Sequence, residues 1–225
     1  MKQINKYICD HFENDKFSIL EHVENSKFSI SEKLHINKDT TNYYNYHPKT
    51  RDELKELVDK LVKERGKDAD LNDIDTSEIT DMNYMFYKSK FNGDISNWNV
   101  SNVESMYRMF YHSKFTGKNG DIFNWDVSNV KDMSYMFSYS EFNGDISKWD
   151  VSNVQSMNSM FLDSKFNGDI SNWDVSNVED IERMFYCSKF KGDISNWNVS
   201  NVKEMGATFF KSPLAKNPPK WYYKR

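Results

Sequence analysis

Histidine is the side chain most often used for acid–base and nucleophilic catalysis near neutral pH, so its positions bear on whether an enzyme is expected. The chain of 225 residues has five histidines, at positions His11, His22, His35, His47 and His112. Only His112 lies where the sequence repeats, and none belongs to an H-E-x-x-H motif. The G-x-S-x-G, P-loop and C-x-x-C motifs are also missing. We therefore expect no enzyme, no catalytic residue and no cofactor. The remaining enzymatic alternative places a site in residues 1–45.

A column of aspartates recurs in Gly-Asp motifs: Asp94, Asp121, Asp145, Asp169 and Asp193. Stacked carboxylates bind Ca²⁺ in some short, glycine-rich repeats. One aspartate per turn supplies too few ligands, so the favoured prediction is that each carboxylate accepts backbone hydrogen bonds within its turn. Cys9 and Cys187 are too far apart to suggest a metal or disulfide framework. No metal site is expected.

Tyrosine and arginine vary between the repeats, and these two residue types are enriched in protein-recognition surfaces. The candidate partner-binding residues are Tyr84, Tyr87, Arg108, Tyr111, Tyr135, Tyr139, Arg183 and Tyr186. The alternative is that these aromatics pack half-buried between adjacent helices. Two outward strand columns vary much less: Asn97, Asn124, Lys148, Asn172 and Asn196, beside Asn99, Asp126, Asp150, Asp174 and Asn198. Their sameness favours a structural role over binding.

The elements that position these side chains come from one repeated phrase, "FNGDISNWNVSNV" at residues 91–103 and its near copies. The tryptophans follow the period at Trp98, Trp125, Trp149, Trp173, Trp197 and Trp221. Phenylalanines recur in the same way at Phe86, Phe110, Phe137, Phe161, Phe185 and Phe209, and ten of the eleven methionines fall in two further columns. A period shared by several columns indicates a stack of similar units.

Within one unit, Ile95, Trp98 and Val100 have the L-x-x-L-x-L spacing of a leucine-rich-repeat strand. Val103, Met106 and the residues up to Phe110 then have helical spacing. The predicted fold class is therefore α/β, a leucine-rich-repeat-like solenoid of about six 24-residue rungs with an N-terminal helical cap.

The expected domains follow from this pattern. Residues 1–45 form an N-terminal segment of unclear fold, through which the chain could form homo-oligomers. Residues 46–73 hold an amphipathic capping helix and an entry strand, residues 74–214 the repeat solenoid, and residues 215–225 a C-terminal cap. Thr50 and Glu53 form a capping box, and Gly66 ends the predicted helix.

The net charge and the hydropathy of the sequence exclude some classes of binding partner. The net charge of −4 and the pI near 5.8 argue against nucleic acid. No apolar run is long enough to span a bilayer, so no membrane is expected. Because the start lacks the apolar core of a signal peptide, we expect a cytoplasmic protein, the alternative being a surface or virion-associated one.

The motif "NGDISNWDVSNV" followed by paired methionines resembles the BspA-type leucine-rich-repeat family of bacterial surface proteins, members of which also occur in phages. The resemblance covers residues 46–225 and implies a right-handed α/β solenoid with a binding or adhesion role. The expected function is a non-enzymatic repeat scaffold that binds another protein. The alternative is an adhesin, cell-surface or virion-associated, that binds carbohydrate or a host surface.

Overall fold

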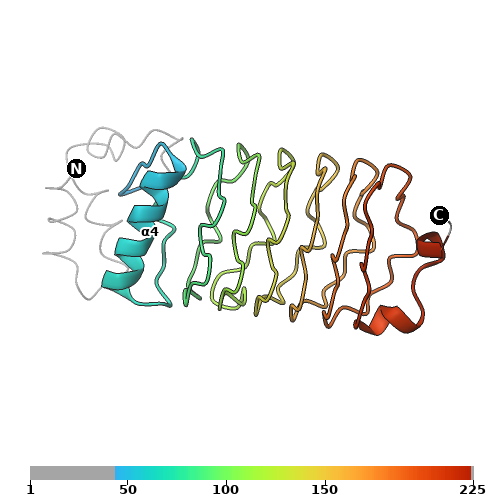
Figure 1. The fold of residues 1–225 in the computed structure, drawn as a ribbon. Coiled ribbons are helices and arrows are strands. Elements are labelled where there is room, and N and C mark those ends of the chain that lie inside the picture. The colour runs from blue at the N-terminus through green and yellow to red at the C-terminus, as the bar shows by residue number, and fades with distance from the viewer. Residues whose placement is uncertain (1–43, 224–225) are drawn as a thin grey trace, which may run out of the picture. The chain divides into compact units, whose positions relative to one another are not determined.

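A computed structural model describes residues 44–223, and the chain from Tyr44 onward forms one compact unit. Its helical elements are α4 (Arg51–Arg65) and two short 3-10 helices, η1 (Pro213–Lys216) and η2 (Lys220–Tyr223). Between α4 and η1 the chain winds through successive coils that lie side by side, each made by one sequence repeat (Figure 1). We call each coil a rung. The expectations for residues 1–43, including oligomerisation through them, fall outside the described residues.

The predicted fold class, an α/β solenoid of leucine-rich-repeat type with a helical cap, is wrong. Residues 44–223 contain one α-helix, which precedes the repeats, and no β-strand. Neighbouring repeats are joined by isolated parallel bridges at Asp81, Ser105, Asp132, Ser156, Asp180 and Glu204. The rungs are built from turns.

The segment predicted as a strand forms two tight turns because polar side chains compete for its backbone. The Trp98 amide donates to the Ile95 carbonyl at 3.1 Å, and the Val103 amide donates to the Val100 carbonyl at 2.9 Å. Just before each turn, Asp94 Oδ1 accepts from the Ser96 amide and Asn99 Oδ1 accepts from the Ser101 amide. Such local bonds offer the backbone an alternative to a sheet ladder, and they recur in every rung with Asp or Asn at these positions.

The segment predicted as a helix is a run of overlapping turns with two left-handed residues. In the second rung these are Arg108, with φ of 56°, and His112, with φ of 54°. A right-handed helix excludes this conformation. The amides of alternate residues therefore point to the next rung: Arg108 donates to the Ser134 carbonyl at 3.0 Å and His112 to the Ser138 carbonyl at 2.9 Å. Hydrogen bonds between rungs replace those of a helix.

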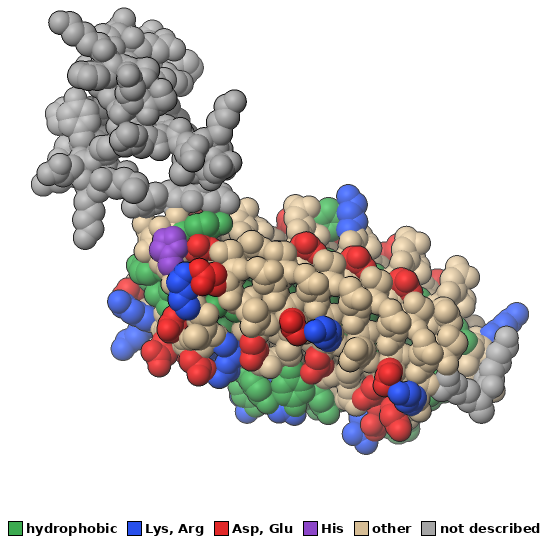
Figure 2. All heavy atoms as spheres, turned by 90° about the horizontal axis from the view of Figure 1, so that it is seen from above, with side chains coloured by type: hydrophobic (Ala, Val, Ile, Leu, Met, Phe, Trp, Pro, Cys, Tyr) green, Lys and Arg blue, Asp and Glu red, His purple; other side chains and the backbone are tan. Residues whose placement is uncertain are grey.

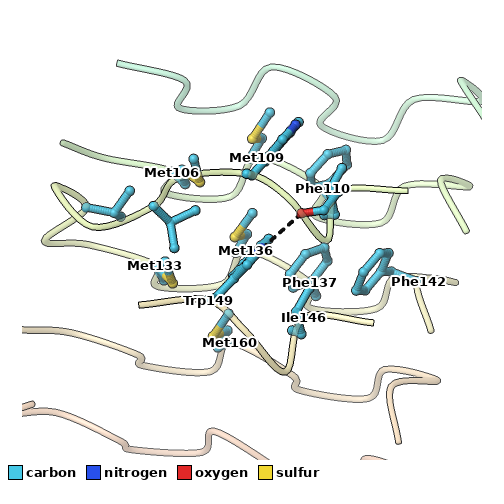
Figure 3. Close-up of a cluster of buried hydrophobic side chains, with 14 of the residues drawn as sticks. Met106, Met109, Phe110, Met133, Met136, Phe137, Phe142, Ile146, Trp149 and Met160 are labelled. Atoms are coloured by element: carbon cyan, nitrogen blue, oxygen red, sulfur yellow. Dashed lines mark hydrogen bonds between the residues drawn. The ribbon is translucent and has the colours of Figure 1, made fainter. Parts of the chain in front are cut away.

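The core is a set of aligned columns, as the shared period predicts. Every indole donates from Nε1 to a carbonyl of the preceding rung, and Trp149 bonds to the Ile122 carbonyl at 2.9 Å (Figure 3). Trp149 is only 3% exposed, and the four tryptophans in the neighbouring rungs are equally well buried. The prediction that the tryptophans share one dry column is confirmed for Trp98, Trp125, Trp149, Trp173 and Trp197, whereas Trp221 at the end of the stack is only partly buried.

Two phenylalanine ladders run beside the tryptophans. Phe110 stacks on Phe137 with ring centroids 5.5 Å apart and planes 2° apart, and the pattern continues from Phe86 to Phe209. The second ladder consists of Phe91, Phe115, Phe142, Phe166 and Phe190. It packs against the first ladder, with the Phe142 ring centroid 4.4 Å from that of Phe137 (Figure 3). A Cβ at Gly144 would lie 2.8 Å from the Phe142 ring, which explains why glycine recurs there.

Helix α4 begins and ends where the sequence predicts a helix. The Thr50 side chain accepts from the Glu53 amide, the Gly66 amide donates to the Val62 carbonyl, and Leu54, Val58 and Leu61 are buried in the same core as the rungs. Arg65 fixes its end with a bidentate pair to Asp73, both N–O distances being 2.9 Å. At the other end of the stack, Trp221 of η2 lies against Trp197 with ring centroids 6.4 Å apart.

Among residues 44–223, no helix has the length and apolarity needed to cross a bilayer.

Candidate binding surface

The aspartates of the Gly-Asp motifs accept backbone hydrogen bonds within their own rungs. Oδ1 of Asp94, Asp145, Asp169 and Asp193 accepts from the amide of the serine two residues later, at 2.8–2.9 Å, and Asp121 does the same for Phe123. These bonds stabilise the carboxylate form, so the pKa of Asp169 and that of Asp193 are lowered. Within the described part of the chain, no three His, Cys, Asp or Glu side chains gather as a metal site.

The asparagine and aspartate residues that follow each tryptophan are also structural. Asn99, Asp126, Asp150, Asp174 and Asn198 each accept from a backbone amide two residues later. A further asparagine in each rung donates from Nδ2 to a serine carbonyl of the preceding rung, as Asn153 does to Ser128 at 2.8 Å. These columns repeat because each rung needs the same bonds.

The repeat positions whose residue types differ between rungs lie together on a separate part of the surface. In the first three rungs they carry aromatic side chains around one arginine, which we call the Tyr–Arg cluster: Tyr84, Tyr87, Tyr107, Arg108, Tyr111, His112, Tyr135 and Tyr139. Figure 2 shows a large group of hydrophobic side chains along one edge of the rungs, with smaller hydrophobic areas elsewhere and acidic side chains at intervals.

Arg108 lies at the centre of the cluster. Its guanidinium carbon is 4.8 Å from the ring centroid of Tyr135, 5.0 Å from that of Tyr107 and 5.4 Å from that of Tyr111, with Tyr84 at 5.9 Å. Each distance is within the range of a cation–π interaction. No carboxylate of the described chain pairs with this guanidinium, and its buried Nε has no hydrogen-bond partner there. The arginine is held by ring faces alone.

The tyrosine rings hold one another as well as the arginine. Tyr87 stacks on Tyr111 at 5.2 Å, and Tyr139 stacks on His112 at 4.6 Å. Tyr139 is 39% exposed, and most other rings of the cluster are half-buried. Because neighbouring rings restrict each side chain, little rotamer entropy remains to be lost when a partner binds.

The protonation states follow from burial and the neighbouring groups. Burial is the largest cause that raises the pKa of Tyr107, and it also raises the pKa of Tyr139. For Arg108, burial lowers the pKa, but Tyr107 and the other phenol groups raise it, and the net shift is upward. These shifts favour a charged Arg108 guanidinium beside neutral Tyr107 and Tyr139 phenols.

Six of the eight predicted binding residues therefore come together, and two do not. Arg183 lies two rungs beyond the last rung of the Tyr–Arg cluster, and its Nη2 is 3.5 Å from Oε1 of Glu182. Tyr186 stacks on Phe210 at 5.1 Å. The alternative of half-buried aromatics fits most of these tyrosines, which are half-buried, whereas Tyr139 is exposed. The rings pack between turns and not between helices, as that alternative had it.

Tyr107 was missed by the sequence reasoning. Its repeat position holds Asn83, Tyr107, Ser134, Asn158, Glu182 and Gly206 in successive rungs. This position varies as much as those of the predicted binding residues. Its ring lies 5.4 Å from Tyr84 and 5.9 Å from Tyr135. The variability of that column was the signal that could have identified it.

The rungs and the cluster together define a repeat protein made of stacked turns, with one aromatic surface patch. The chain belongs to the family described as Mycoplasma protein of unknown function, DUF285, which matches residues 53–141 and 113–221. No curated protein and no solved structure gives a significant match. The resemblance to BspA-type proteins stays a prediction.

Proposed function

We propose that this protein is a non-enzymatic scaffold that binds another protein through the Tyr–Arg cluster, and that it acts in the cytoplasm. The observation that carries the proposal is Arg108, a charged side chain surrounded by tyrosine rings and without a carboxylate partner in the described chain. The side chains that build the core repeat in nearly every rung, whereas the cluster occupies positions at which the rungs differ. A function specific to this surface accounts for that difference.

The composition of the cluster supports a protein partner. Interaction hot spots are rich in tyrosine and arginine, and they are often surrounded by contacts that exclude water. The half-buried rings around Arg108 provide such surroundings. A partner that places a carboxylate or a carbonyl group against the guanidinium would supply the hydrogen bonds that Arg108 lacks.

The test compares two arginines at the same repeat position. Arg108 and Arg183 are both left-handed, with φ of 56° and 54°, but only Arg108 belongs to the cluster. The full-length protein, Arg108→Met and Arg183→Met are used for quantitative affinity capture from the cytosol of the native host, followed by mass spectrometry. We expect one protein to be captured by the unchanged chain and by Arg183→Met, and to fall at least tenfold with Arg108→Met.

Capture that is independent of Arg108 would contradict the proposal. The adhesin alternative is distinguished by a glycan array probed with the same three proteins. Glycan binding that is lost with Arg108→Met and kept with Arg183→Met, without a captured protein, would favour carbohydrate recognition instead.

A further inference from the structure

The last rung displays a row of free backbone amides. In each inner rung, four alternate amides donate to carbonyls of the next rung, as Ile181, Arg183, Phe185 and Cys187 do to residues 204–210 at 2.8–2.9 Å. The equivalent donors of the last rung are Met205, Ala207, Phe209 and Lys211. No residue from 44 to 223 accepts from these four amides. Residues 205–211 therefore form an edge with four amides that lack acceptors within the described residues, which we call the amide edge. The Lys203 carbonyl, equivalent to the Glu179 carbonyl that accepts from the Lys203 amide, likewise has no donor there.

An unpaired row of this kind is a template for another polypeptide. Edge amides bind the carbonyls of an added segment, and main-chain hydrogen bonds then provide the affinity. The segments that follow η1 leave much of the edge accessible, since Lys211 is exposed and Met205 and Ala207 are half-buried. Phe209 alone is covered, with the Tyr222 ring 5.0 Å away.

Beside the amide edge is a small apolar hollow of about 200 Å³. It is lined by Ala207, Phe209, Phe210, Ala215, Pro218, Tyr222 and Tyr223. Phe210 is 49% exposed and Tyr223 is 70% exposed, which makes them two of the three most exposed large hydrophobic residues described. The volume suits one or two apolar side chains of a bound segment.

The side chains around the amide edge are mostly basic, and this favours an acidic polypeptide as the bound segment. Residues 203–223 include one acidic side chain, Glu204, although the whole chain has a net charge of −4. Lys211, Lys216 and Lys220 are exposed, and none of the three forms an ion pair within the described chain. Three lysines without an ion pair in the described chain, close in sequence to the row of amide donors, favour a partner with negative charge. Lys211 Nζ also lies 5.4 Å from the Phe210 ring centroid.

We propose that the amide edge is a docking site for an acidic polypeptide segment of a partner protein, which binds as an additional rung and places an apolar side chain in the hollow. A second copy of this chain is the less suitable occupant, because the first rung, whose carbonyls would have to meet these amides, packs against α4, and Asn83 of that rung accepts from Arg51 at 3.2 Å. The surface is distinct from the Tyr–Arg cluster, so this inference does not depend on the proposed function.

The chain itself supplies a probe. Residues 179–188 are acidic overall, and their carbonyls already accept from four amides of the preceding rung, with Ser159 donating to the Glu182 carbonyl at 2.8 Å. A labelled synthetic peptide of these residues, with Cys187 changed to serine, is titrated against the full-length protein. Its matched control has Glu179, Asp180 and Glu182 changed to the corresponding amides. We expect saturable binding of the acidic peptide and binding at least tenfold weaker for the control.

Two readouts locate the peptide. In amide hydrogen exchange, Ala207 and Lys211 of the free protein should exchange at least tenfold faster than Arg183 and Cys187, and saturating peptide should slow them at least tenfold. The double variant Lys211→Glu/Lys216→Glu should weaken binding at least tenfold, while Lys90→Glu/Lys118→Glu, with the same charge change on exposed lysines elsewhere, should stay within twofold.

The proposal is overturned if saturating peptide leaves Ala207 and Lys211 unprotected, or if both double variants bind equally well. It is also overturned if analytical ultracentrifugation shows self-association that Lys211→Glu/Lys216→Glu abolishes, since a second copy would then occupy the edge.

Discussion

Each tryptophan contributes both packing and one hydrogen bond to the stability of its rung. Trp149 is buried against Phe137, with ring centroids 6.3 Å apart, and its indole satisfies the Ile122 carbonyl. Ring area alone therefore does not explain why tryptophan recurs at this position. Phenylalanine could fill most of the space, but it would remove one of the two donors to the Ile122 carbonyl, leaving the Trp125 amide at 3.2 Å as the other.

Substitution of Trp149 separates these two contributions. Trp149→Ala should lower the free energy of unfolding by roughly 3–5 kcal/mol, because it opens a cavity in the column. Trp149→Phe should cost about 1 kcal/mol, because it removes the indole hydrogen bond while the Ile122 carbonyl keeps the Trp125 amide as a donor. Chemical denaturation of both variants measures the difference. Equal midpoints for Trp149→Phe and the unchanged protein would show that the indole bond contributes nothing.

At the scale of the element, helix α4 is tied to the first rung by the pair of Arg65 with Asp73. The hydrogen bonds from Arg65 are the main reason that the pKa of Asp73 is lowered, with burial opposing them and Asn45 adding a further bond. A carboxyl whose pKa is lower in the folded state stabilises the fold above its unfolded pKa, near 3.9. This contribution is lost as the pH falls through the lower, folded value.

Asp73→Asn should therefore destabilise the protein at pH 7 by about 1 kcal/mol, a value reduced for the partial exposure of the pair. The difference from the unchanged protein should shrink below about pH 4. Thermal unfolding from pH 7 to pH 2.5 measures it, and Glu64→Gln on the same helix, with no ion pair in the described chain, is the control. A difference that stays constant down to pH 2.5 would exclude the pair as its cause.

The elements also show where sequence reasoning succeeds and where it fails. The α4 boundaries are predictable, because Thr50, Glu53 and Gly66 act locally. The aligned columns are predictable, because their period is a property of the sequence. Strands and helices within the rungs are predicted wrongly, because Ile95 to Phe110 have apolar spacings that fit regular elements. The left-handed conformations of Arg108 and His112 depend on bonds to the next rung, which no local pattern contains.

The candidate surface is predictable in part for a similar reason. Variation between rungs identifies Tyr84, Arg108 and Tyr135 as unusual, and the fixed period places them in neighbouring rungs. It does not reveal that Tyr107 joins them or that Arg183 pairs with Glu182, since both depend on the directions of side chains. The amide edge has no sequence signature at all. It is recognised only when the bonds of the inner rungs are known.

At the scale of the whole repeat region, every inner interface is made by the same bonds and the same stacked rings. Stability is then close to a sum of rung and interface contributions. Deletion of residues 127–150 should leave a folded protein one rung shorter, because Asp126 is equivalent to Asp150 and so takes its place before Val151. We expect cooperative unfolding in denaturant with a smaller m-value, since less surface is exposed on unfolding.

The matched comparison is a deletion of the same length that starts at another position of the repeat, residues 133–156, and joins Asp132 to Met157. This junction is also one period apart, so the two shortened chains should have closely similar midpoints. A deletion of twelve residues, 127–138, breaks the period and should abolish the cooperative transition. Loss of folding in both in-register chains would contradict the additive stack.

The near-identity of the interfaces has a genetic consequence. Repeated coding segments of equal length invite unequal recombination, and here a gain or loss of one segment produces a chain that still folds. Each exchanged segment carries its own variable side chains with it, so the Tyr–Arg cluster, which spans three rungs, is rearranged by a single event. Shuffled copies would therefore present new combinations of surface side chains on an unchanged core, without the accumulation of point mutations.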